Sequence, residues 1–194
     1  MRAMILAGTY SIVGHCTRTG MLGVVAGSTA VMMGSRVPYT KAGVGAIACQ
    51  ALINPYLGAA GVSLLEEGLS VEQALQRLVE GDNGRDLRQF AIVDSVGRAA
   101  AHTGKQCLPW AGHLLREGYA CLGNAVEGQH VLQSMARSFK ENHEAELPDR
   151  LLACLEAGQQ AAVVKGATRS ACVRIVRLSP CDRIAGLPID WLGH

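Results

Sequence analysis

Ala7-Gly8-Thr9-Tyr10-Ser11-Ile12-Val13 is the stretch that places a hydroxyl residue, Thr9, directly after a glycine. Its β-branched and aromatic residues have high β-propensity, so the stretch predicts the first β-strand, with Thr9 at its head. Residues 1–8 precede the strand, and their removal would leave Thr9 with a free α-amino group. A residue that holds both a nucleophilic hydroxyl and a free amine can perform acyl transfer by itself. The simpler interpretation is that Thr9 is a strand residue selected for its β-propensity alone.

The composition is that of one globular domain. The chain has 194 residues, of which 49% are hydrophobic and 18% are charged, and this length is usual for a single domain. Aromatic residues make up only 4% of the chain, and 23 residues are glycine. The core must therefore be built from Ala, Val, Leu, Ile and Met, which lets sheets and helices approach closely, with glycines in tight turns.

Charge and targeting signals exclude several classes of function. The formal net charge is +2, and the basic residues are spread along the chain, whereas nucleic-acid binding needs a clustered basic patch with aromatic residues. The apolar part of residues 1–8 is too short for a signal peptide, and no stretch reaches membrane length. No P-loop or strand-linked G-x-G-x-x-G motif is present. We therefore expect no nucleic acid, no membrane and no cofactor.

The seven cysteines are scattered and form no C-x-x-C pair, which argues against a zinc site and against a disulfide framework. In apolar strings such as Ala46-Ile47-Ala48-Cys49 a free cysteine behaves as a small buried hydrophobe. This usage favours a reduced, cytoplasmic setting. The six histidines form no H-x-H or H-E-x-x-H pattern, so we expect no metal.

Strand signals and helix signals occur in groups along the chain. Strands are expected at residues 9–16, 21–26, 44–50, 88–94, 99–104, 118–124 and 168–178, and helices at 55–67, 70–80, 128–140 and 147–155. Residues 9–26 and 88–104 form hairpins, and residues 105–117 form an irregular connection. Helix pairs inserted between antiparallel groups predict an α+β fold, with two central sheets covered by helices on both outer faces.

Two helix starts carry capping signals. Asn54 is expected to cap the first helix, with Pro55 at its first position and Gly68 just beyond its end. Ser70 and Gln73 have the spacing of a capping box at the start of the second helix.

Taken in chain order, several segments resemble the DUF1028 family, proteins of uncharacterised function placed in the N-terminal nucleophile (Ntn) hydrolase superfamily. The matching segments are residues 9–13 (TYSIV), 43–50 (GVGAIACQ), 54–58 (NPYLG), 88–89 (RQ), 93–94 (VD), 103–104 (TG), 110–112 (WAG) and 118–124 (GYACLGN). The resemblance implies a four-layer αββα sandwich over residues 9–178, with Thr9 where the superfamily keeps its nucleophile. Residues 1–8 would then be a removable leader, and residues 179–194 a C-terminal tail.

Two features depart from the family pattern. In most members of the family the threonine follows the initiator methionine or a cleavable leader, whereas a short leader without signal-peptide character precedes it here. A Gly-Thr junction is one that some threonine peptidases of the superfamily cleave by themselves. The family's Gly-Gly-Asp-x-x-Gly-like segment is replaced by residues 162–170 (AVVKGATRS), which lack the acidic residue.

A freed Thr9 would need a base and an oxyanion site. An α-amino group titrates near pH 8, so it is partly neutral at physiological pH and can accept the hydroxyl proton. Asn124, with backbone amides, is the first candidate to hold the oxyanion, and Gln50 is the next. Both also have ordinary structural explanations, because Asn after Gly often takes a left-handed turn and a strand-terminal Gln can bond to the backbone.

Four further residues are candidates for substrate binding. Lys41 precedes a strand and could lower the pKa of a nearby nucleophile, or it could be a solvated turn residue. Arg88 could bind a carboxylate in bidentate fashion, or Arg88 and Asp94 could belong to structural ion pairs. His102 lies in a strand beside Thr103 and could face a pocket.

Three hypotheses about function remain at this point. In the first, the chain is an Ntn-type hydrolase that cleaves an amide bond of a small molecule or short peptide, with Thr9 as nucleophile. In the second, it is a non-catalytic binding or assembly module that retains its leader. In the third, Cys16 or Cys49 is the nucleophile, which would require an electropositive niche that their apolar neighbours do not suggest. Because the helices keep apolar outer positions, we also expect a homo-oligomer, a dimer or larger.

Overall fold

The computed structural model describes residues 8–162 and 168–179, which form two antiparallel sheets and four α-helices. The first sheet has five strands in the order β7-β8-β1-β2-β9. Its strands are β1 (Thr9–His15), β2 (Leu22–Ser28), β7 (Gly112–Arg116), β8 (Tyr119–Asn124) and β9 (Ser170–Val176). Strand β1 lies at its centre, and β2 and β8 pair with β1 on either side.

The second sheet has four strands in the order β3-β4-β5-β6. Its strands are β3 (Pro38–Lys41), β4 (Gly45–Ala51), β5 (Arg88–Asp94) and β6 (Ala99–Thr103). Consecutive strands of this sheet are neighbours, but α1 and α2 are inserted between β4 and β5. Two short 3₁₀ helices, Met33–Ser35 and Arg85–Leu87, precede β3 and β5.

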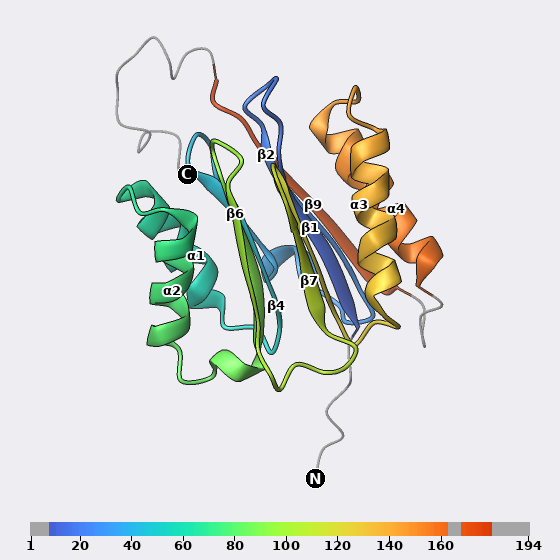
Figure 1. The fold of residues 1–194 in the computed structure, drawn as a ribbon, viewed down its shortest axis with the longest axis horizontal. Helices are drawn as coiled ribbons and strands as arrows, with labels where there is room; N and C mark the ends of the chain where they lie inside the picture. Colours follow the sequence, from blue (N-terminus) through green and yellow to red (C-terminus); the bar gives the residue numbers. More distant parts are fainter. Residues whose placement is uncertain (1–7, 163–167, 180–194) are drawn as a thin grey trace.

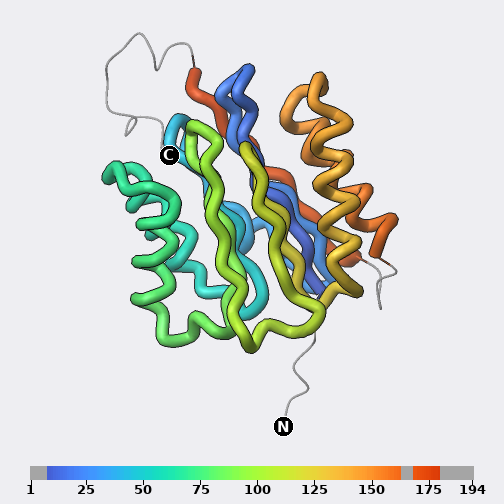
Figure 2. Tube along the Cα trace, viewed as in Figure 1, coloured from blue at the N-terminus to red at the C-terminus, as the bar shows by residue number. Residues whose placement is uncertain are grey.

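The helices form two antiparallel pairs, one on the outer face of each sheet. They are α1 (Pro55–Glu66), α2 (Val71–Gly81), α3 (Gln129–Glu141) and α4 (Leu147–Ala161). Figures 1 and 2 show α1 and α2 against the β3–β6 sheet on one side of the molecule, and α3 and α4 against the other sheet on the opposite side. The two sheets face each other between the helix pairs (Figure 1).

The side chains of the buried strands β1, β2, β4 and β5 alternate between two apolar cores. On β1, Tyr10 and Ile12 face α3 and α4, where they pack with Leu132 and Phe139. Val13 faces the opposite sheet and belongs to the core between the sheets, which is made mostly of Ala and Val. A third core, around Phe90, lies under α1 and α2. The small side chains between the sheets agree with the low aromatic content of the chain.

The expected α+β class and both hairpins are confirmed, since β1 pairs with β2 and β5 with β6. Asn54 caps α1 by accepting a hydrogen bond from the Tyr56 backbone N–H. Ser70 and Gln73 form the predicted capping box of α2. In the residues that the structure describes, no helix combines the length and apolar character needed to cross a membrane.

The expected irregular connection over residues 105–117 is wrong. Its second half forms β7, an edge strand that pairs with β8 from Gly112↔Gly123 to Arg116↔Tyr119. Pro109 just before the strand and Gly112 at its start are typical of a loop. The side chains of β7 are largely exposed, so the strand also lacks a continuous apolar run. The last helix also continues to Ala161 rather than ending at residue 155. Of the expected tail, residues 180–194 lie outside the described part, as do leader residues 1–7.

Candidate functional site

Polar side chains gather at one end of the core between the sheets. Thr9 and Ser11 project from β1 into the space that Val13 occupies further along, because strand residues two apart share a face. The register pairs Thr9 with both Ser28 and Asn124, so all three lie at the same end of the first sheet. Gln50 and Gln89 lie opposite each other at the corresponding end of the second sheet. Each of these side chains is almost fully buried.

Gln89 links the two sheets through its amide group. Its Oε1 accepts hydrogen bonds from Gln50 Nε2 at 2.7 Å and from Asn124 Nδ2 at 3.2 Å. Its Nε2 lies 3.0 Å from Thr103 Oγ1 and 2.9 Å from each of the carbonyl oxygens of Gly112 and Gly123. Gln89 is fully buried, so these bonds fix its position, because a buried amide without partners would be costly.

Gln50 connects this group to β1. Its Nε2 also donates to the Thr9 carbonyl oxygen at 3.2 Å, and its Oε1 accepts a hydrogen bond from Ser11 Oγ at 2.6 Å. Gln50, Gln89 and Asn124 together form what we call the amide cluster. The cluster holds the first residues of β1 between the two sheets through side chains that are themselves fixed by hydrogen bonds.

The Thr9 hydroxyl and the Gly8 carbonyl share one partner, Ser28. Thr9 Oγ1 lies 2.9 Å from Ser28 Oγ, and Ser28 Oγ donates to the Gly8 carbonyl oxygen at 2.9 Å. The Thr29 backbone N–H donates to the same carbonyl oxygen at 3.0 Å. Because the single hydroxyl hydrogen of Ser28 is donated to Gly8, Ser28 Oγ is the acceptor for the Thr9 hydroxyl. Ser28 Oγ also accepts a hydrogen bond from the Ala30 backbone N–H at 3.0 Å. The peptide bond between Gly8 and Thr9 is thus surrounded by oriented polar groups.

A cavity of about 550 Å³ opens beside Gly8, on the side of the sheet that carries α3 and α4. Its size is within the usual range of small-molecule sites. Its described lining residues are Gly8, Tyr10, Thr29, Pro109, Trp110, Ala125, Val126, Glu127, Ala162 and Thr168. Thr9 itself does not line the cavity and is only 3% exposed. Gly8 therefore lines the cavity, whereas the residue that follows it, Thr9, does not.

Two of the predicted site residues, Gln50 and Asn124, lie with Thr9. Asn124 is opposite Thr9 in the register between β1 and β8, and Gln50 contacts the Thr9 carbonyl. Asn124 donates to Gln89 and is followed by Ala125, which has a positive φ of 50°. The sequence thus located the strand ends that meet at Thr9.

Lys41 and Asp94 lie at the opposite end of the second sheet. Lys41 pairs with Gly45, and Gly45 pairs with Asp94, whereas Gln50 is near the other end of β4. At about 3.3 Å per residue this separation is about 17 Å. Lys41 forms an ion pair with Glu66, and Asp94 accepts hydrogen bonds from the backbone N–H groups of residues 96 and 98 and pairs with the Arg98 side chain. Both therefore have local structural partners.

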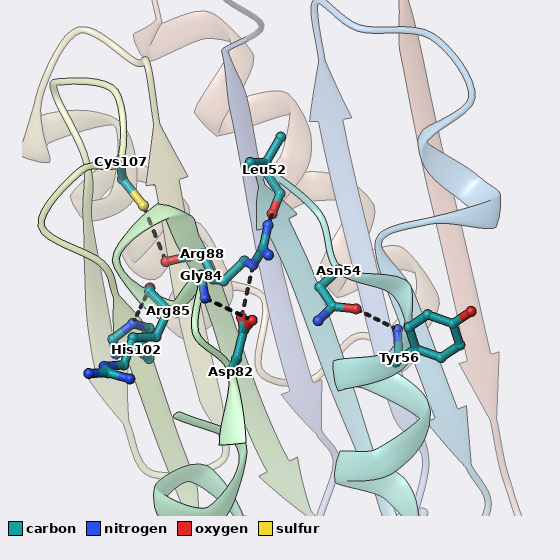
Figure 3. Close-up of polar contacts among 9 residues, drawn as sticks. All are labelled: Leu52, Asn54, Tyr56, Asp82, Gly84, Arg85, Arg88, His102 and Cys107. Carbon is teal, nitrogen blue, oxygen red and sulfur yellow. Dashed lines mark hydrogen bonds and ion pairs between the residues drawn. The ribbon is translucent and has the colours of Figure 1, made fainter. Parts of the chain in front are cut away.

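Arg88 and His102 lie near the Thr9 end but project from the other face of their sheet. Arg88 Nε donates to Asp82 Oδ2 at 2.8 Å and its Nη1 donates to the Leu52 carbonyl oxygen at 2.6 Å (Figure 3). Figure 3 also shows His102 directed to the carbonyl oxygen of Arg85, 2.8 Å from Nε2. The His102 ring packs against the Phe90 ring, with centroids 5.4 Å apart and an interplanar angle of 43°. Of the two alternatives for Arg88, the structure therefore shows the structural ion pair, and its partner is Asp82.

The sequence did not identify Ser28, Gln89 or Thr103 as members of this group. The alternation of β5 places Gln89, and not the charged Arg88 beside it, between the sheets. Likewise Thr103, and not its neighbour His102, reaches the amide cluster. Ser28 lies beyond the strand expected at residues 21–26, because β2 continues to residue 28. The sequence signal that could have identified these residues is a polar residue an even number of positions from the small apolar residues of the same strand, because such a residue shares their face.

The cysteines offer little support for thiol chemistry at this end of the molecule. Burial raises the pKa of the Cys49 thiol to about 12, which keeps it protonated at neutral pH. Cys16 follows the far end of β1; burial opposes its ionisation, but hydrogen bonds from Thr19 and Arg18 outweigh that effect and lower its pKa. Among the described residues, no group of three or more His, Cys, Asp or Glu side chains is placed to hold a metal ion.

Comparison with known proteins gives a family and a structural neighbour. Residues 9–194 match the model of a family of unknown function, DUF1028. Protein SPO2555 from Silicibacter pomeroyi, whose crystal structure is described as a member of the same family, superimposes with a TM-score of 0.82 at 29% sequence identity, covering 88% of this chain and 74% of that one. No curated protein matches the chain.

Proposed function

The chain belongs to the DUF1028 family, whose function is unknown, and from the geometry at Gly8 and Thr9 we propose that it is an amide hydrolase. In this proposal Thr9 becomes the nucleophile once the bond between Gly8 and Thr9 is cut. The substrate is an amide of a small molecule or short peptide. We further propose that the layered fold is an αββα sandwich of the Ntn-hydrolase type, because β1, which carries Thr9, is central and a helix pair lies on each outer face (Figure 1).

One observation carries the proposal: the Gly8 carbonyl oxygen has two donors, and one of them also holds the Thr9 hydroxyl. The Thr29 N–H and the Ser28 hydroxyl both point at this oxygen, at 3.0 and 2.9 Å. Two donors on a carbonyl oxygen at these distances have the form of an oxyanion site. Ser28 Oγ is at the same time 2.9 Å from Thr9 Oγ1. A nucleophile, an oxyanion site and a proton acceptor thus surround one peptide bond.

This arrangement supports removal of the leader by the chain itself. Thr9 Oγ1 attacks the Gly8 carbonyl carbon, and its proton passes to Ser28 while the Ser28 proton passes to the developing oxyanion. The C–N bond then breaks, the nitrogen takes the proton from the tetrahedral hydroxyl group, and an ester joins Gly8 to Thr9 Oγ1. Water hydrolyses the ester, which releases the leader as an acid and leaves Thr9 with a free amine and hydroxyl.

In the mature chain the same groups would act on a substrate amide. The freed Thr9 amine accepts the hydroxyl proton, since an α-amine titrates near pH 8, and later transfers it to the leaving amine. Ser28 and the Thr29 N–H hold the oxyanion. One hydrogen of the Asn124 amide is bonded to Gln89, and an amide group has a second hydrogen to offer. We assign that second hydrogen to the oxyanion as well, with Gln50 positioning the Thr9 backbone.

Intact-mass spectrometry of the purified full-length protein tests maturation directly. We expect a species that begins at Thr9, and we expect Thr9→Ala to remain uncut. Thr9→Ser should restore cutting because it keeps the hydroxyl, whereas Ser28→Ala should slow cutting by about 100-fold, as loss of an oxyanion donor does in other enzymes. Thr103→Val serves as a matched control, because it removes a hydroxyl that touches the amide cluster but neither Thr9 nor Gly8.

The competing hypothesis is a binding or assembly module that keeps its leader. The anchoring of Gly8 by Ser28 and Thr29, together with the burial of Thr9, is also what a permanent leader would need. An uncut wild-type protein, together with an inert chain engineered to begin at Thr9 and tested on a panel of amides, would refute the hydrolase and favour the module.

A further inference from the structure

We propose that the substrate's acyl half is a glycyl unit with a neutral aromatic or aliphatic N-acyl group, R–CO–NH–CH₂–CO–NH–R′. This inference rests on the proposed function, in which the substrate acyl group forms the same ester with Thr9 Oγ1 that the Gly8 acyl group forms during removal of the leader. The contacts of Gly8 then define what the site accepts. Each part of the residue, its nitrogen, its α-carbon and its carbonyl, has a separate contact.

Thr29 binds the glycyl unit at both ends. The Gly8 N–H donates to Thr29 Oγ1 at 3.0 Å, and the Thr29 N–H donates to the Gly8 carbonyl oxygen at 3.0 Å. A substrate with an N–H on its α-carbon can repeat the first bond. A substrate that lacks this N–H would leave the Thr29 hydroxyl without its partner, which weakens binding.

The α-carbon has no room for an L side chain. A Cβ built on Gly8 would lie 2.7 Å from the carbonyl oxygen of Ala125, closer than real Cβ contacts. This oxygen belongs to backbone that cannot move easily, because the Ala125 N–H bonds to the Leu108 carbonyl and the preceding residue, Asn124, pairs with Thr9. An alanyl or larger acyl residue would therefore have to displace the end of β8. Glycine fits because it has only hydrogen at this point.

The cavity beside Gly8 supplies the space for the N-acyl group. Tyr10, Trp110 and Val126 give it apolar walls, and among the described lining residues Glu127 is the only charged side chain. A cavity of about 550 Å³ accepts a benzoyl group or a short acyl chain, and the Glu127 carboxylate disfavours an anionic one. The four further candidates for substrate binding are not among the described lining residues; they are Lys41, Arg88, Asp94 and His102.

The reaction balances as an acyl transfer followed by hydrolysis. Thr9 Oγ1 bonds to the glycyl carbonyl carbon, the C–N bond to R′ breaks, and the leaving amine takes the proton that the Thr9 amine had accepted. Water then cleaves the ester and releases an N-acylglycine. Thr9 returns to its starting state, and no oxidant, reductant or further reactant is needed.

The specificity is tested with the p-nitroanilides of N-benzoylglycine, N-benzoyl-L-alanine and N-benzoylsarcosine. The enzyme is the mature chain, either self-cut or engineered to begin at Thr9; this chain retains every described strand and helix. Release of p-nitroaniline is followed by its absorbance at 405 nm. We expect kcat/KM to fall at least about 30-fold from glycine to alanine, the size of an overpacking penalty, and about 10-fold from glycine to sarcosine, the size of one hydrogen bond. Equal rates on all three would overturn the inference.

Thr29→Val separates the two contacts. The variant keeps the backbone N–H but removes Oγ1, so the preference for glycine over sarcosine should disappear while the preference for glycine over alanine remains. A merely structural role of Thr29 would lower all three rates together and leave both ratios unchanged, which would contradict the assignment of Thr29.

Binding of the three free acids distinguishes failure of this inference from failure of the proposed function. Trp110 lines the cavity, and the second of the two tryptophans can be replaced by Trp191→Phe so that fluorescence reports on Trp110. N-benzoylglycine should bind about 10-fold or more tightly than either analogue. Selective binding without hydrolysis would refute the hydrolase but keep the glycyl site. Hydrolysis or binding without selectivity would refute the glycyl site alone.

Discussion

Two threonines near the sheet core differ in the partners of their hydroxyl groups. Thr40 Oγ1 is buried and has no hydrogen bond within the described part of the chain, whereas Thr103 Oγ1 bonds with Gln89 and His113. Thr40→Val keeps the side-chain shape and removes an unsatisfied group, so it should raise the free energy of unfolding by about 1 kcal/mol. Thr103→Val should lower it by about 1 kcal/mol. Urea denaturation measures both, and a destabilised Thr40→Val would contradict this assignment.

Gln89 offers a test of the amide cluster at the level of one side chain. In Gln89→Leu the new side chain has a volume similar to that of glutamine, but it forms no hydrogen bonds. Gln50, Asn124 and two carbonyl groups would each lose one hydrogen-bond partner. We expect a loss of about 3 kcal/mol in the free energy of unfolding, at the upper end of the range for a single substitution.

The matched control for Gln89 is Gln76, whose exposed side chain donates a hydrogen bond to Glu80 on the surface of α2. Gln76→Leu should change the free energy of unfolding by no more than about 0.5 kcal/mol. Equal costs for the two glutamine substitutions would show that the cluster does not stabilise the fold.

At the residue scale the sequence located part of the site and not the rest. Gln50 and Asn124 could be predicted because each ends a strand signal and carries an amide. Charge and imidazole chemistry favour Arg88 and His102 as candidates from sequence, but their neighbours Gln89 and Thr103 are the residues that face the core between the sheets. The face that a side chain takes depends on the phase of its strand, and a shift of one residue reverses it.

Helix α1 packs closely on its sheet through glycine. A Cβ on Gly58 would lie 2.1 Å from the ring of Tyr39 on β3, so Gly58→Ala should lower the free energy of unfolding by about 2 kcal/mol, although alanine favours helix by about 1 kcal/mol. At Gly81, at the end of α2, nothing lies within 4 Å of the added Cβ. Gly81→Ala should therefore be neutral or stabilise by up to about 1 kcal/mol. Thermal or urea unfolding of both variants measures the difference between the two sites. A Gly81→Ala variant that is destabilised as Gly58→Ala is would contradict the prediction.

At the element scale, the sequence predicted the features that depend on hydrogen bonds between residues close together in the chain. Asn54 and Ser70 cap their helices as expected because a cap depends on residues only a few positions away. Strand β7 could not be predicted in the same way. It is an edge strand with exposed side chains, and its hydrogen bonds to β8 define it more than its own composition does.

At the scale of the whole molecule, the grouping of strands and helices along the sequence is sufficient to predict the α+β class. It is not sufficient to predict the order of the strands in each sheet. The neighbours of β1 are β2, which follows it directly, and β8, which is about a hundred residues further along the chain. Pairing over such separations depends on tertiary packing, and no local pattern encodes it. The homo-oligomer and the cytoplasmic setting stay predictions; size-exclusion chromatography with light scattering would test the first.

The end of the molecule opposite Thr9 should make stability depend on pH. His15, the last residue of β1, is 6% exposed, and its Nδ1 has no hydrogen bond within the described residues. Burial lowers the pKa of His15, and the nearby Asp94 charge opposes this only in part. The unfolded chain therefore binds a proton near pH 6.5, its ordinary value, whereas the folded chain does so only at lower pH. The unfolded state binds more protons in that interval, so stability falls as the pH drops from about 7.

His15→Gln removes the titrating group and should flatten this dependence. Burial, with the His102 charge as a smaller contribution, also lowers the pKa of His113. The wild-type protein therefore loses stability at low pH through two histidines, and His113→Gln is the companion variant. We expect the fall in the free energy of unfolding from pH 7.5 to pH 5.5 to be smaller in His15→Gln than in the wild type, by up to about 1 kcal/mol. Urea denaturation at the two pH values measures the difference. Parallel pH profiles for the wild type and His15→Gln would mean that His15 binds its proton equally well in the folded and unfolded chains.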